Sequence, residues 1–157
     1  MEEKNDIVRV EGRPFIAGFN WSVGFQMERF IKAFANKKIL ASKCPKCGYT
    51  YVPPRSRCGK CNARIEEKDL LDLSGKGTLV GYTTAHVELD GAGNFLDLKK
   101  AKLIGAIKLD GADSTIFMPL EEVKAKDLKE GMKVAVNWKD KTKGEIADIK
   151  SFKPEKA

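Results

Sequence analysis

A single stripe of apolar residues predicts one helix near the start of the chain. The stripe repeats every three to four residues, as one face of an α-helix does. It consists of Val23, Met27, Phe30, Ile31 and Phe34. Ser22 stands directly before the stripe and is predicted to be the N-cap of the helix. Trp21 and Phe25 fall nearly on the opposite side, because successive residues of a helix are turned by about 100°.

Aromatic side chains on two faces of this N-terminal helical arm, residues 1–38, indicate a docking surface. One small body covers only one face of a helix, and exposed apolar surface is typical of an interaction site. Phe19, Trp21 and Phe25 are therefore predicted to bind a protein partner. The alternative is that these rings pack against the rest of the same chain.

Residues 67–157 alternate between short apolar runs and turns that contain glycine, a pattern typical of strands. The runs are 70–73, 78–89, 102–109, 114–118, 134–138 and 145–149. Gly81 is expected to bend or bulge the longest run, and residues 121–128 are expected to form a short helix or helical turn. About five bent strands with a helical segment before the fourth favour a small closed barrel, most simply an OB-fold. A β-sandwich is the alternative.

The composition is that of a globular chain. The 157 residues are 42% apolar and 32% charged, which argues against a disordered tail and a membrane protein. No apolar run is long enough to span a bilayer, and the charged first six residues lack the apolar core of a secretion signal. We therefore expect a cytoplasmic protein whose cysteines stay reduced.

All four cysteines fall in two CxxC motifs. The motifs are Cys44-Pro45-Lys46-Cys47-Gly48 and Cys58-Gly59-Lys60-Cys61-Asn62. Doubled CxxC turns direct four thiolates at one ion, and Gly48, Gly59 and Asn62 are expected to permit the tight backbone of these turns. This spacing predicts a zinc ribbon with a closed, structural site.

Two short strands are expected to flank the first motif, at 39–41 and 49–52. Pro53 and Pro54 end the second strand, because proline has no N–H to donate. The resulting ribbon, residues 39–66, has little core of its own without the metal. Iron in a rubredoxin-like site shares the four-sulfur geometry, and disulfides or a redox pair are the remaining alternatives.

The net charge of +7 is concentrated in the first part of the chain. Residues 44–61 contain four basic and no acidic side chains, whereas residues 62–157 contain seventeen of each sign. Four thiolates around a divalent metal reduce the charge of the cysteine segment but leave it positive. This distribution favours a mild anion-attracting patch over a strongly basic nucleic-acid surface.

The chain resembles the two-domain zinc-ribbon and OB-fold family known as domain of unknown function thirty-five. The resemblance rests on the helical arm and on KCPKCG at 43–48, PPR at 53–55, SGKGT at 74–78 and DLKEGMKV at 127–134. It implies a rubredoxin-like zinc ribbon followed by an OB-fold barrel, consistent with three parts at 1–38, 39–66 and 67–157.

The resemblance also implies an acyl-CoA-handling role, commonly as a non-catalytic partner of thiolase-like enzymes. Similar proteins in archaea bridge acetoacetyl-CoA thiolase and hydroxymethylglutaryl-CoA synthase. Other relatives accompany hydratases or aldolases, so the resemblance alone does not fix the partner.

A coenzyme A site needs a few cations at its mouth and a lined groove beyond, because the ligand has phosphates at one end and an amide-containing arm. Arg55, Arg57 and Lys76 are the candidate cations. Gly75 and Gly77 are candidates for close backbone approach to a phosphate. Each residue has an ordinary alternative as a surface charge or a turn residue.

The residues give little support to catalysis. His86 is the single histidine, on a predicted strand with Glu88 two residues along, and we interpret it as structural. With the cysteines at a metal, no thiol nucleophile remains. We therefore expect a protein that is not an enzyme.

The rival function is single-stranded nucleic-acid binding, which needs a positive groove and stacking rings on the barrel. The rings of residues 62–157 are Tyr82, Phe95, Phe117, Trp138 and Phe152. Because this part of the chain has no net charge, the acyl-CoA scaffold is the preferred interpretation.

Overall fold

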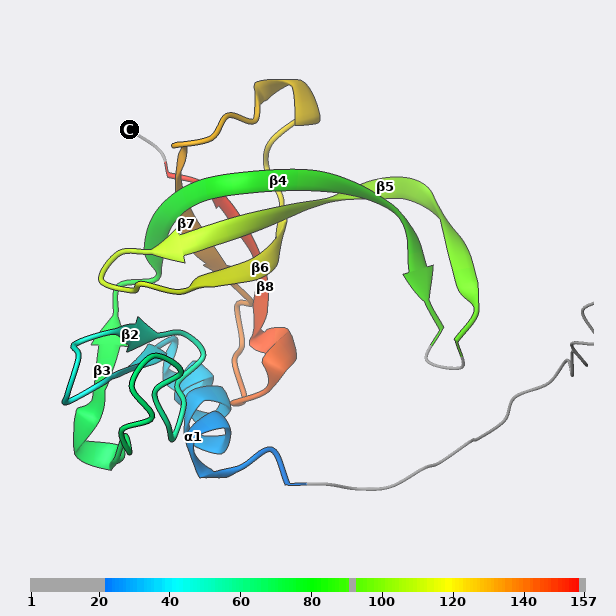
Figure 1. Ribbon diagram of the computed structural model, residues 1–157. Coiled ribbons are helices and arrows are strands. Elements are labelled where there is room, and N and C mark those ends of the chain that lie inside the picture. Colours follow the sequence, from blue (N-terminus) through cyan, green and yellow to red (C-terminus); the bar gives the residue numbers. More distant parts are fainter. Residues whose placement is uncertain (1–21, 91–92, 156–157) are drawn as a thin grey trace, which may run out of the picture.

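The computed structural model describes residues 22–90 and 93–155 and consists mainly of strands (Figure 1). One helix, α1 (Phe25–Ala33), stands at the start and continues into a 3-10 turn, η1 (Phe34–Asn36). A three-stranded sheet and a closed five-stranded barrel follow, and two barrel strands extend into a long arm. This architecture confirms the predicted class. Within the described residues, no helix is long and apolar enough to cross a membrane.

Helix α1 begins after Gly24, whose φ of +83° lies in the region that favours glycine. Gly24 is the N-cap, and the Ser22 hydroxyl accepts a hydrogen bond from the Gly24 N–H (3.2 Å). The predicted cap at Ser22 is therefore wrong. The predicted stripe also starts too early, because Val23 precedes the helix and is 52% exposed. Phe30 and Phe34 confirm the rest of it, since both are buried with ring centroids 4.7 Å apart.

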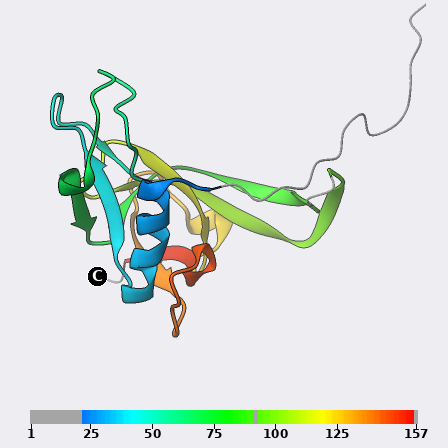
Figure 2. The same cartoon turned by 90° about the horizontal axis from the view of Figure 1, so that it is seen from below.

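The helix packs between the ribbon sheet and the barrel. It contacts strand β1 (Ile39–Lys43) on one side and lies beside the connection between the last two barrel strands on the other (Figure 2). Two contacts fix the barrel side: the rings of Phe34 and Trp138 meet edge to face at 5.5 Å, and the Thr142 hydroxyl donates to the Ala35 carbonyl (2.8 Å). The helix is thus part of the folded body.

The small sheet has the order β2-β1-β3. Strand β2 (Thr50–Tyr51) pairs with the end of β1, and β3 (Leu70–Leu73) pairs antiparallel with β1 from the other side. By sequence, β3 falls in the predicted 67–157 domain, but its hydrogen bonds are with the ribbon. A 3-10 turn, η2 (Glu67–Asp69), leads into it. The domain division at 38/39 and 66/67 stays a prediction.

Five strands close the barrel in the order β4-β5-β6-β8-β7. They are β4 (Lys76–Leu89), β5 (Phe95–Leu109), β6 (Thr115–Leu120), β7 (Lys133–Trp138) and β8 (Ile149–Pro154). Only β6 and β8 pair in parallel. The predicted helical turn is η3 (Ala125–Asp127), between the third and fourth barrel strands. These features confirm the OB-fold and exclude the sandwich.

The predicted strand at 145–149 is wrong. A 3-10 turn, η4 (Ile146–Asp148), takes its place, and β8 begins only at Ile149. The cause is the buried carboxylate of Asp148, which accepts hydrogen bonds from three successive N–H groups. These are the N–H groups of Lys143 (2.9 Å), Gly144 (2.7 Å) and Glu145 (2.9 Å). A chain wrapped around one carboxylate cannot extend as a strand.

The main core fills the barrel and continues under α1. Leu79, Ile107, Val134 and Phe152 are fully buried at its centre, and the two buried rings of the helical segment join the same cluster. Gly105 shows how closely this core is packed, because a Cβ at this position would lie 2.7 Å from Leu79 Cδ1.

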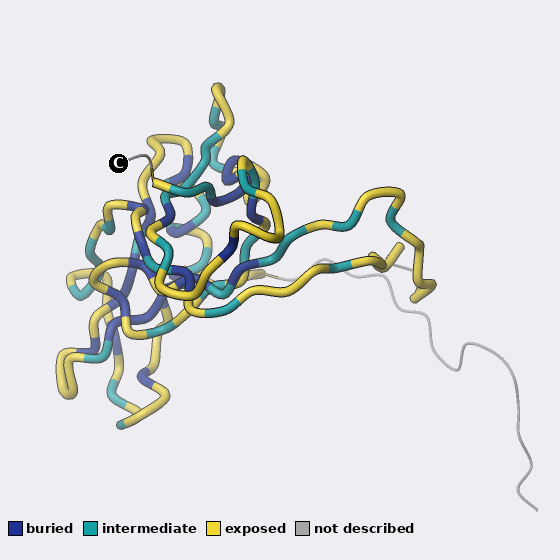
Figure 3. Tube along the Cα trace, turned by 90° about the horizontal axis from the view of Figure 1, so that it is seen from above, coloured by how far each residue is buried: buried dark blue, intermediate teal, exposed yellow. Residues whose placement is uncertain are grey.

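Beyond the barrel, β4 and β5 continue together as a two-stranded arm, residues 82–89 and 95–102 (Figure 3). Strand β7 pairs with β4 only at 76–78, and β6 pairs with β5 only at 103–108. The register shifts between Leu79 and Gly81, which confirms the predicted bulge near Gly81. Further out, residues 98–101 of β5 stand opposite His86 alone. The extra length of β5 lies on the outer side of the bend in Figure 1.

Candidate metal centre and adjoining cleft

The two CxxC knuckles have the same backbone. The N–H of Gly48 donates to the carbonyl of Cys44, and the N–H of Asn62 donates to the carbonyl of Cys58, both at 2.9 Å. Gly48 and Asn62 stand at equivalent places and have positive φ values of 75° and 56°. Glycine and asparagine are the residues that adopt this conformation most readily, so the local sequence determines both turns.

The four sulfurs gather at one point. Their Sγ atoms all lie within 4.8 Å of one another, and two pairs, Cys44 with Cys61 and Cys47 with Cys58, are 3.5 Å apart. Zn–S bonds of about 2.3 Å place the sulfurs of a tetrahedron roughly 3.8 Å apart, so a zinc ion fits among them. A disulfide needs about 2.05 Å. Four thiolates leave no position for water, which makes the metal structural.

Tyr51 supports this centre from β2. Its buried hydroxyl accepts the Gly59 N–H (2.9 Å) and lies 3.3 Å from the Sγ of Cys58, to which it donates. This hydrogen bond is the largest cause that lowers the pKa of Cys58 to about 6, and the backbone N–H groups of Cys61 and Lys60 add to it; the lowered pKa favours the metal-binding thiolate. Gly59 has no positive φ, so its predicted role in the turn is wrong; a Cβ there would contact the Tyr51 hydroxyl at 3.5 Å. The alternation of residues along the predicted strand 49–52 does not indicate that Tyr51 supports the metal site.

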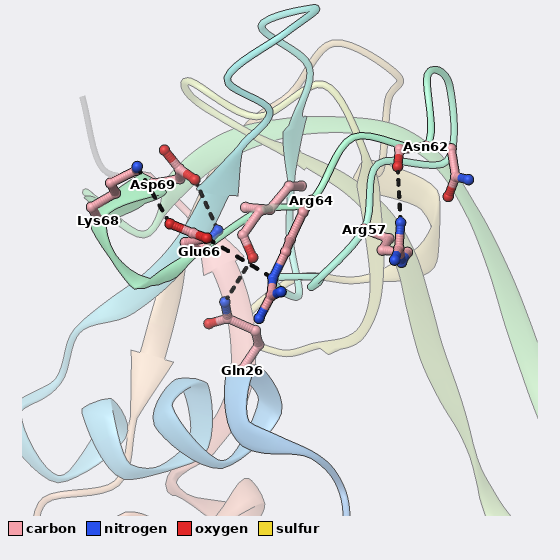
Figure 4. A network of polar contacts seen from close by, with 8 residues as sticks. Gln26, Arg57, Asn62, Arg64, Glu66, Lys68 and Asp69 are labelled. Atoms are coloured by element: carbon pink, nitrogen blue, oxygen red, sulfur yellow. Dashed lines mark hydrogen bonds and ion pairs between the residues drawn. The ribbon is translucent and has the colours of Figure 1, made fainter.

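A cleft of about 680 Å³ lies next to the metal centre, between the start of α1 and the second half of the ribbon. Residues 23–27, 54–56 and 64–67 line it. Arg55 is the one lining residue among the five predicted to bind CoA. Arg64, which the sequence analysis did not single out, adds a second guanidinium; Figure 4 shows its side chain beside the amide of Gln26.

Gln26 is the buried polar side chain of this cleft, with 8% of its surface exposed. Its Nε2 donates to the carbonyl of Ile65 at 3.5 Å (Figure 4). Its Oε1 is buried without a hydrogen-bond partner among the described residues. An unpaired buried acceptor costs about 1–3 kcal/mol, and this oxygen is free to accept a hydrogen bond. Gln26 lies four residues before Phe30, so helical periodicity places it beside the apolar stripe, and these two are the buried residues of α1.

The acidic wall of the cleft is paired. Glu67 forms an ion pair with Arg29, and Glu66 Oε1 lies 3.9 Å from Arg64 Nε. The guanidinium of Arg55 lies over the Tyr51 ring, 5.3 Å from its centroid. The lining thus has two guanidinium groups and two carboxylates, and among the described residues Arg55 is the lining cation that forms no ion pair.

The other residues predicted to bind CoA lie elsewhere. Arg57 stands at the second knuckle, where its guanidinium donates to the Asn62 carbonyl (3.2 Å) (Figure 4). Lys76 forms an ion pair with Glu155 on the barrel. Gly75 and Gly77 are buried at the junction of ribbon and barrel, where added Cβ atoms would lie 2.7 Å from Val136 Cγ1 and 2.5 Å from the Lys108 carbonyl oxygen. Close packing explains both glycines without a phosphate.

Of the residues predicted to bind a partner, Phe25 is described. It is 60% exposed at the first position of α1, with the Arg29 guanidinium 4.1 Å from its ring centroid. Phe19 and Trp21 lie outside the described residues. His86 is exposed on the arm, and Glu88 pairs with Lys102 (2.6 Å).

Two family descriptions match the chain. Residues 32–66 match the rubredoxin-like zinc ribbon domain of ChsH2, and residues 71–139 match the C-terminal OB-fold domain of ChsH2. Together they span more than half of the sequence, and residues 67–70, which lead into β3, lie between them. A search of curated proteins finds no match to the sequence.

Solved structures share the fold. One is described as "Ltp2-ChsH2(DUF35) aldolase"; it has 15% identity and a TM-score of 0.61, and the match covers 86% of this chain and 98% of that chain. Another is a protein of unknown function from the DUF35 family of Sulfolobus solfataricus. It has 24% identity and a TM-score of 0.60, and the match covers 84% of this chain and 87% of that chain.

Proposed function

The chain belongs to the ChsH2 family of zinc-ribbon and OB-fold proteins, and on that premise we propose that it is a non-catalytic accessory subunit. In this proposal it binds an acyl-CoA thioester and docks a thiolase-like enzyme of the acetoacetyl-CoA thiolase or hydroxymethylglutaryl-CoA synthase type. A cytoplasmic location is part of the same proposal. The description of a similar structure as an Ltp2–ChsH2 aldolase supports an enzyme partner.

The cleft at α1 is the observation that carries the CoA part of the proposal. CoA presents phosphates that suit guanidinium groups and amide N–H groups that need acceptors. Arg55 and Arg64 are the guanidinium groups for the phosphates. The unpaired Gln26 Oε1 is the acceptor for an amide N–H of the ligand. The volume of about 680 Å³ is in the range of small-molecule sites. Arg57, Lys76, Gly75 and Gly77 stay predictions outside this cleft.

The zinc has a supporting part in this proposal. When bound, it holds the two knuckles together and thereby fixes the second half of the ribbon, which forms one wall of the cleft. The chemistry of the thioester belongs to the partner enzyme.

Phe25 supports the docking part. Its ring stands at the rim of the cleft with 60% of its surface exposed, directly after the segment that contains Phe19 and Trp21. Exposed rings beside a ligand cleft suit an interface with an enzyme that shares the ligand.

Calorimetric titration with acetyl-CoA tests the cleft. Gln26→Leu removes both the unpaired Oε1 and the Nε2 donor to the Ile65 carbonyl, so thermal stability should change little, whereas CoA affinity should fall roughly tenfold. Arg64→Ala should weaken binding by a similar factor. Lys60→Ala is the matched control, because it removes a ribbon cation that does not line the cleft. Unchanged affinity in both cleft variants would contradict the assigned site.

Co-purification tests the docking. A Phe25→Ser chain should lose a thiolase-like partner that the natural chain retains from its native source. Phe117→Ser, an exposed ring on β6 (73%), serves as the control. Equal recovery of the partner by both variants would contradict docking at Phe25.

Nucleic-acid binding remains the second candidate because of an exposed ring on the barrel, Phe117 of β6, which is 73% exposed. Tyr82 does not extend this surface, because it stands opposite Gly105 and Phe117 opposite Ala106, which places the two rings on opposite faces of the sheet. A single-stranded oligonucleotide titrated at rising ionic strength distinguishes the two functions. Nucleic-acid affinity should fall steeply with salt, and no measurable affinity at low salt would eliminate this candidate.

A further inference from the structure

The four cysteines of the metal centre differ in how far solvent reaches them. Cys44 and Cys58, the first cysteine of each knuckle, are 1% and 3% exposed. Cys61 is half-buried, whereas Cys47 is exposed. An oxidant dissolved in water therefore reaches Cys47 more readily than its three companions. A cysteine that binds zinc is a thiolate, and accessible thiolates with a second sulfur close by are the cysteines that respond to oxidants.

The second sulfur for Cys47 lies in the other knuckle. The Sγ atoms of Cys47 and Cys58 are 3.5 Å apart. A disulfide needs about 2.05 Å, so the two sulfurs have to approach by roughly 1.5 Å. Cys58 is buried and accepts a hydrogen bond from the Tyr51 hydroxyl (3.3 Å), which shields its sulfur from solvent. The geometry therefore separates an exposed thiolate from a protected one beside it.

We propose that the ribbon is a reversible redox switch, in which a peroxide oxidises Cys47 first and Cys58 completes a disulfide. The Cys47 thiolate attacks one oxygen of hydrogen peroxide, the O–O bond breaks, and hydroxide leaves a sulfenic acid on Cys47. The Cys58 thiolate then attacks the Cys47 sulfur and displaces a second hydroxide. Two thiolates thus lose two electrons to one peroxide, and the products are one disulfide and two hydroxide ions.

The disulfide removes two of the four ligands of the metal. Two thiolates alone do not fill a tetrahedral zinc site, so the oxidised chain should release the ion. The ribbon should loosen at the same time, because two of the four buried residues of its small cluster are metal ligands. Arg55 and Arg64 lie in this part of the chain and line the Gln26 cleft. An effect on CoA rests on the proposed function, whereas the release of the metal does not.

Exposure of the zinc-loaded full chain to hydrogen peroxide tests the switch, with a chromophoric chelator to follow the released zinc. Release should become faster as the peroxide concentration rises, and dithiothreitol with added zinc should restore the starting state. In partly oxidised samples, differential alkylation and peptide mass spectrometry should find Cys47–Cys58 as the first disulfide. No zinc release at millimolar peroxide overturns the proposal, and so does a different first disulfide.

Histidine substitutions test the point of entry, because three cysteines and one histidine are an ordinary ligand set for structural zinc. Cys47→His should hold zinc and release it roughly tenfold more slowly under peroxide, since the exposed thiolate is gone. Cys61→His is the matched control: it changes the second cysteine of the other knuckle, which is half-buried, and should release zinc at close to the natural rate. Zinc content and circular dichroism before oxidation confirm that each variant is folded. Equal rates for the two variants overturn the assignment of Cys47, and the disulfide map of the natural chain decides it independently of either variant.

Discussion

At the scale of single residues, the hydroxyl of Tyr51 has the most specific role in the metal centre. Tyr51→Phe keeps the buried ring but removes the donor to Cys58 Sγ. Groups that support metal ligands typically contribute 10–100-fold to affinity, so we expect zinc affinity to fall by about that factor. Competition with a chromophoric chelator measures the change.

The matched control for this substitution is Tyr49→Phe. The Tyr49 hydroxyl donates to the Asp113 carbonyl (3.2 Å) rather than to a sulfur, although the two rings are neighbours at 4.6 Å. Zinc affinity should therefore stay unchanged in Tyr49→Phe. Equal affinities for all three chains would show that the hydrogen bond to Cys58 does not support the metal.

The stability of the fold should depend on pH through the carboxyl of Asp148. Hydrogen bonds from the N–H groups of Glu145, Lys143 and Gly144 outweigh burial and lower the pKa of this carboxyl. A group with a lowered folded-state pKa stabilises the fold above its unfolded pKa, and this contribution is lost as the pH falls through the folded pKa. Asp148→Asn should lower the melting temperature by several degrees at neutral pH, and the difference should shrink below about pH 4.

Melting curves measured across the acidic range check this expectation. Asp140→Asn is the control, because Asp140 is an exposed acid in the same connection. Its melting curve should follow that of the natural chain at every pH. A difference between Asp148→Asn and the natural chain that persists unchanged into strong acid would contradict the assigned cause.

At the scale of elements, the sequence predicted those turns and strands whose conformation depends on neighbouring residues. The knuckles follow from cysteine spacing with Gly48 and Asn62, and most of the barrel follows from strand alternation. The exceptions depend on contacts between distant parts of the chain. Strand β3 pairs with β1 because both flank the ribbon, and the Gln26 cleft requires Ile65 to lie against α1. Neither spacing nor periodicity along the chain encodes such a contact.

Helix α1 also depends on distant contacts, because it packs into the main core. A test of the docking arm therefore has to keep the helix. Deleting residues 1–38 removes Phe30 and Phe34, which belong to the main core. Each such loss costs about 3–5 kcal/mol, against a total stability of about 5–15 kcal/mol for a domain. We expect the 1–38 deletion to unfold or aggregate. Deletion of residues 1–21 should leave a cooperative thermal transition and lose the partner.

Calorimetry of the two deletions checks this difference. A 1–38 deletion that melts like the full chain would show that α1 does not stabilise the body. A 1–21 deletion that still co-purifies with the enzyme would remove Phe19 and Trp21 from the predicted dock.

At the scale of the whole molecule, the part of the chain that the structure describes has two separate hydrophobic clusters. The main core is shared by α1, β1 and the barrel, whereas the second is small and consists of Cys44, Tyr51, Cys58 and Ile65 around the metal centre. Two of the four residues in the small cluster are metal ligands. The ribbon tip therefore depends on zinc far more than the barrel does.

Removal of the metal should consequently unfold only part of the molecule. After chelation, amide hydrogen exchange should accelerate across residues 44–65 and remain slow in the paired barrel strands, because the main core does not include the metal ligands. CoA binding should disappear at the same time, since Arg55, Arg64 and the Ile65 carbonyl that holds Gln26 all belong to the loosened segment. Exchange measured by mass spectrometry, with acetyl-CoA titrated into the same samples, follows both effects. A single global transition would mean that the ribbon and the barrel fold as one unit, and full CoA affinity without metal would place the ligand away from the ribbon.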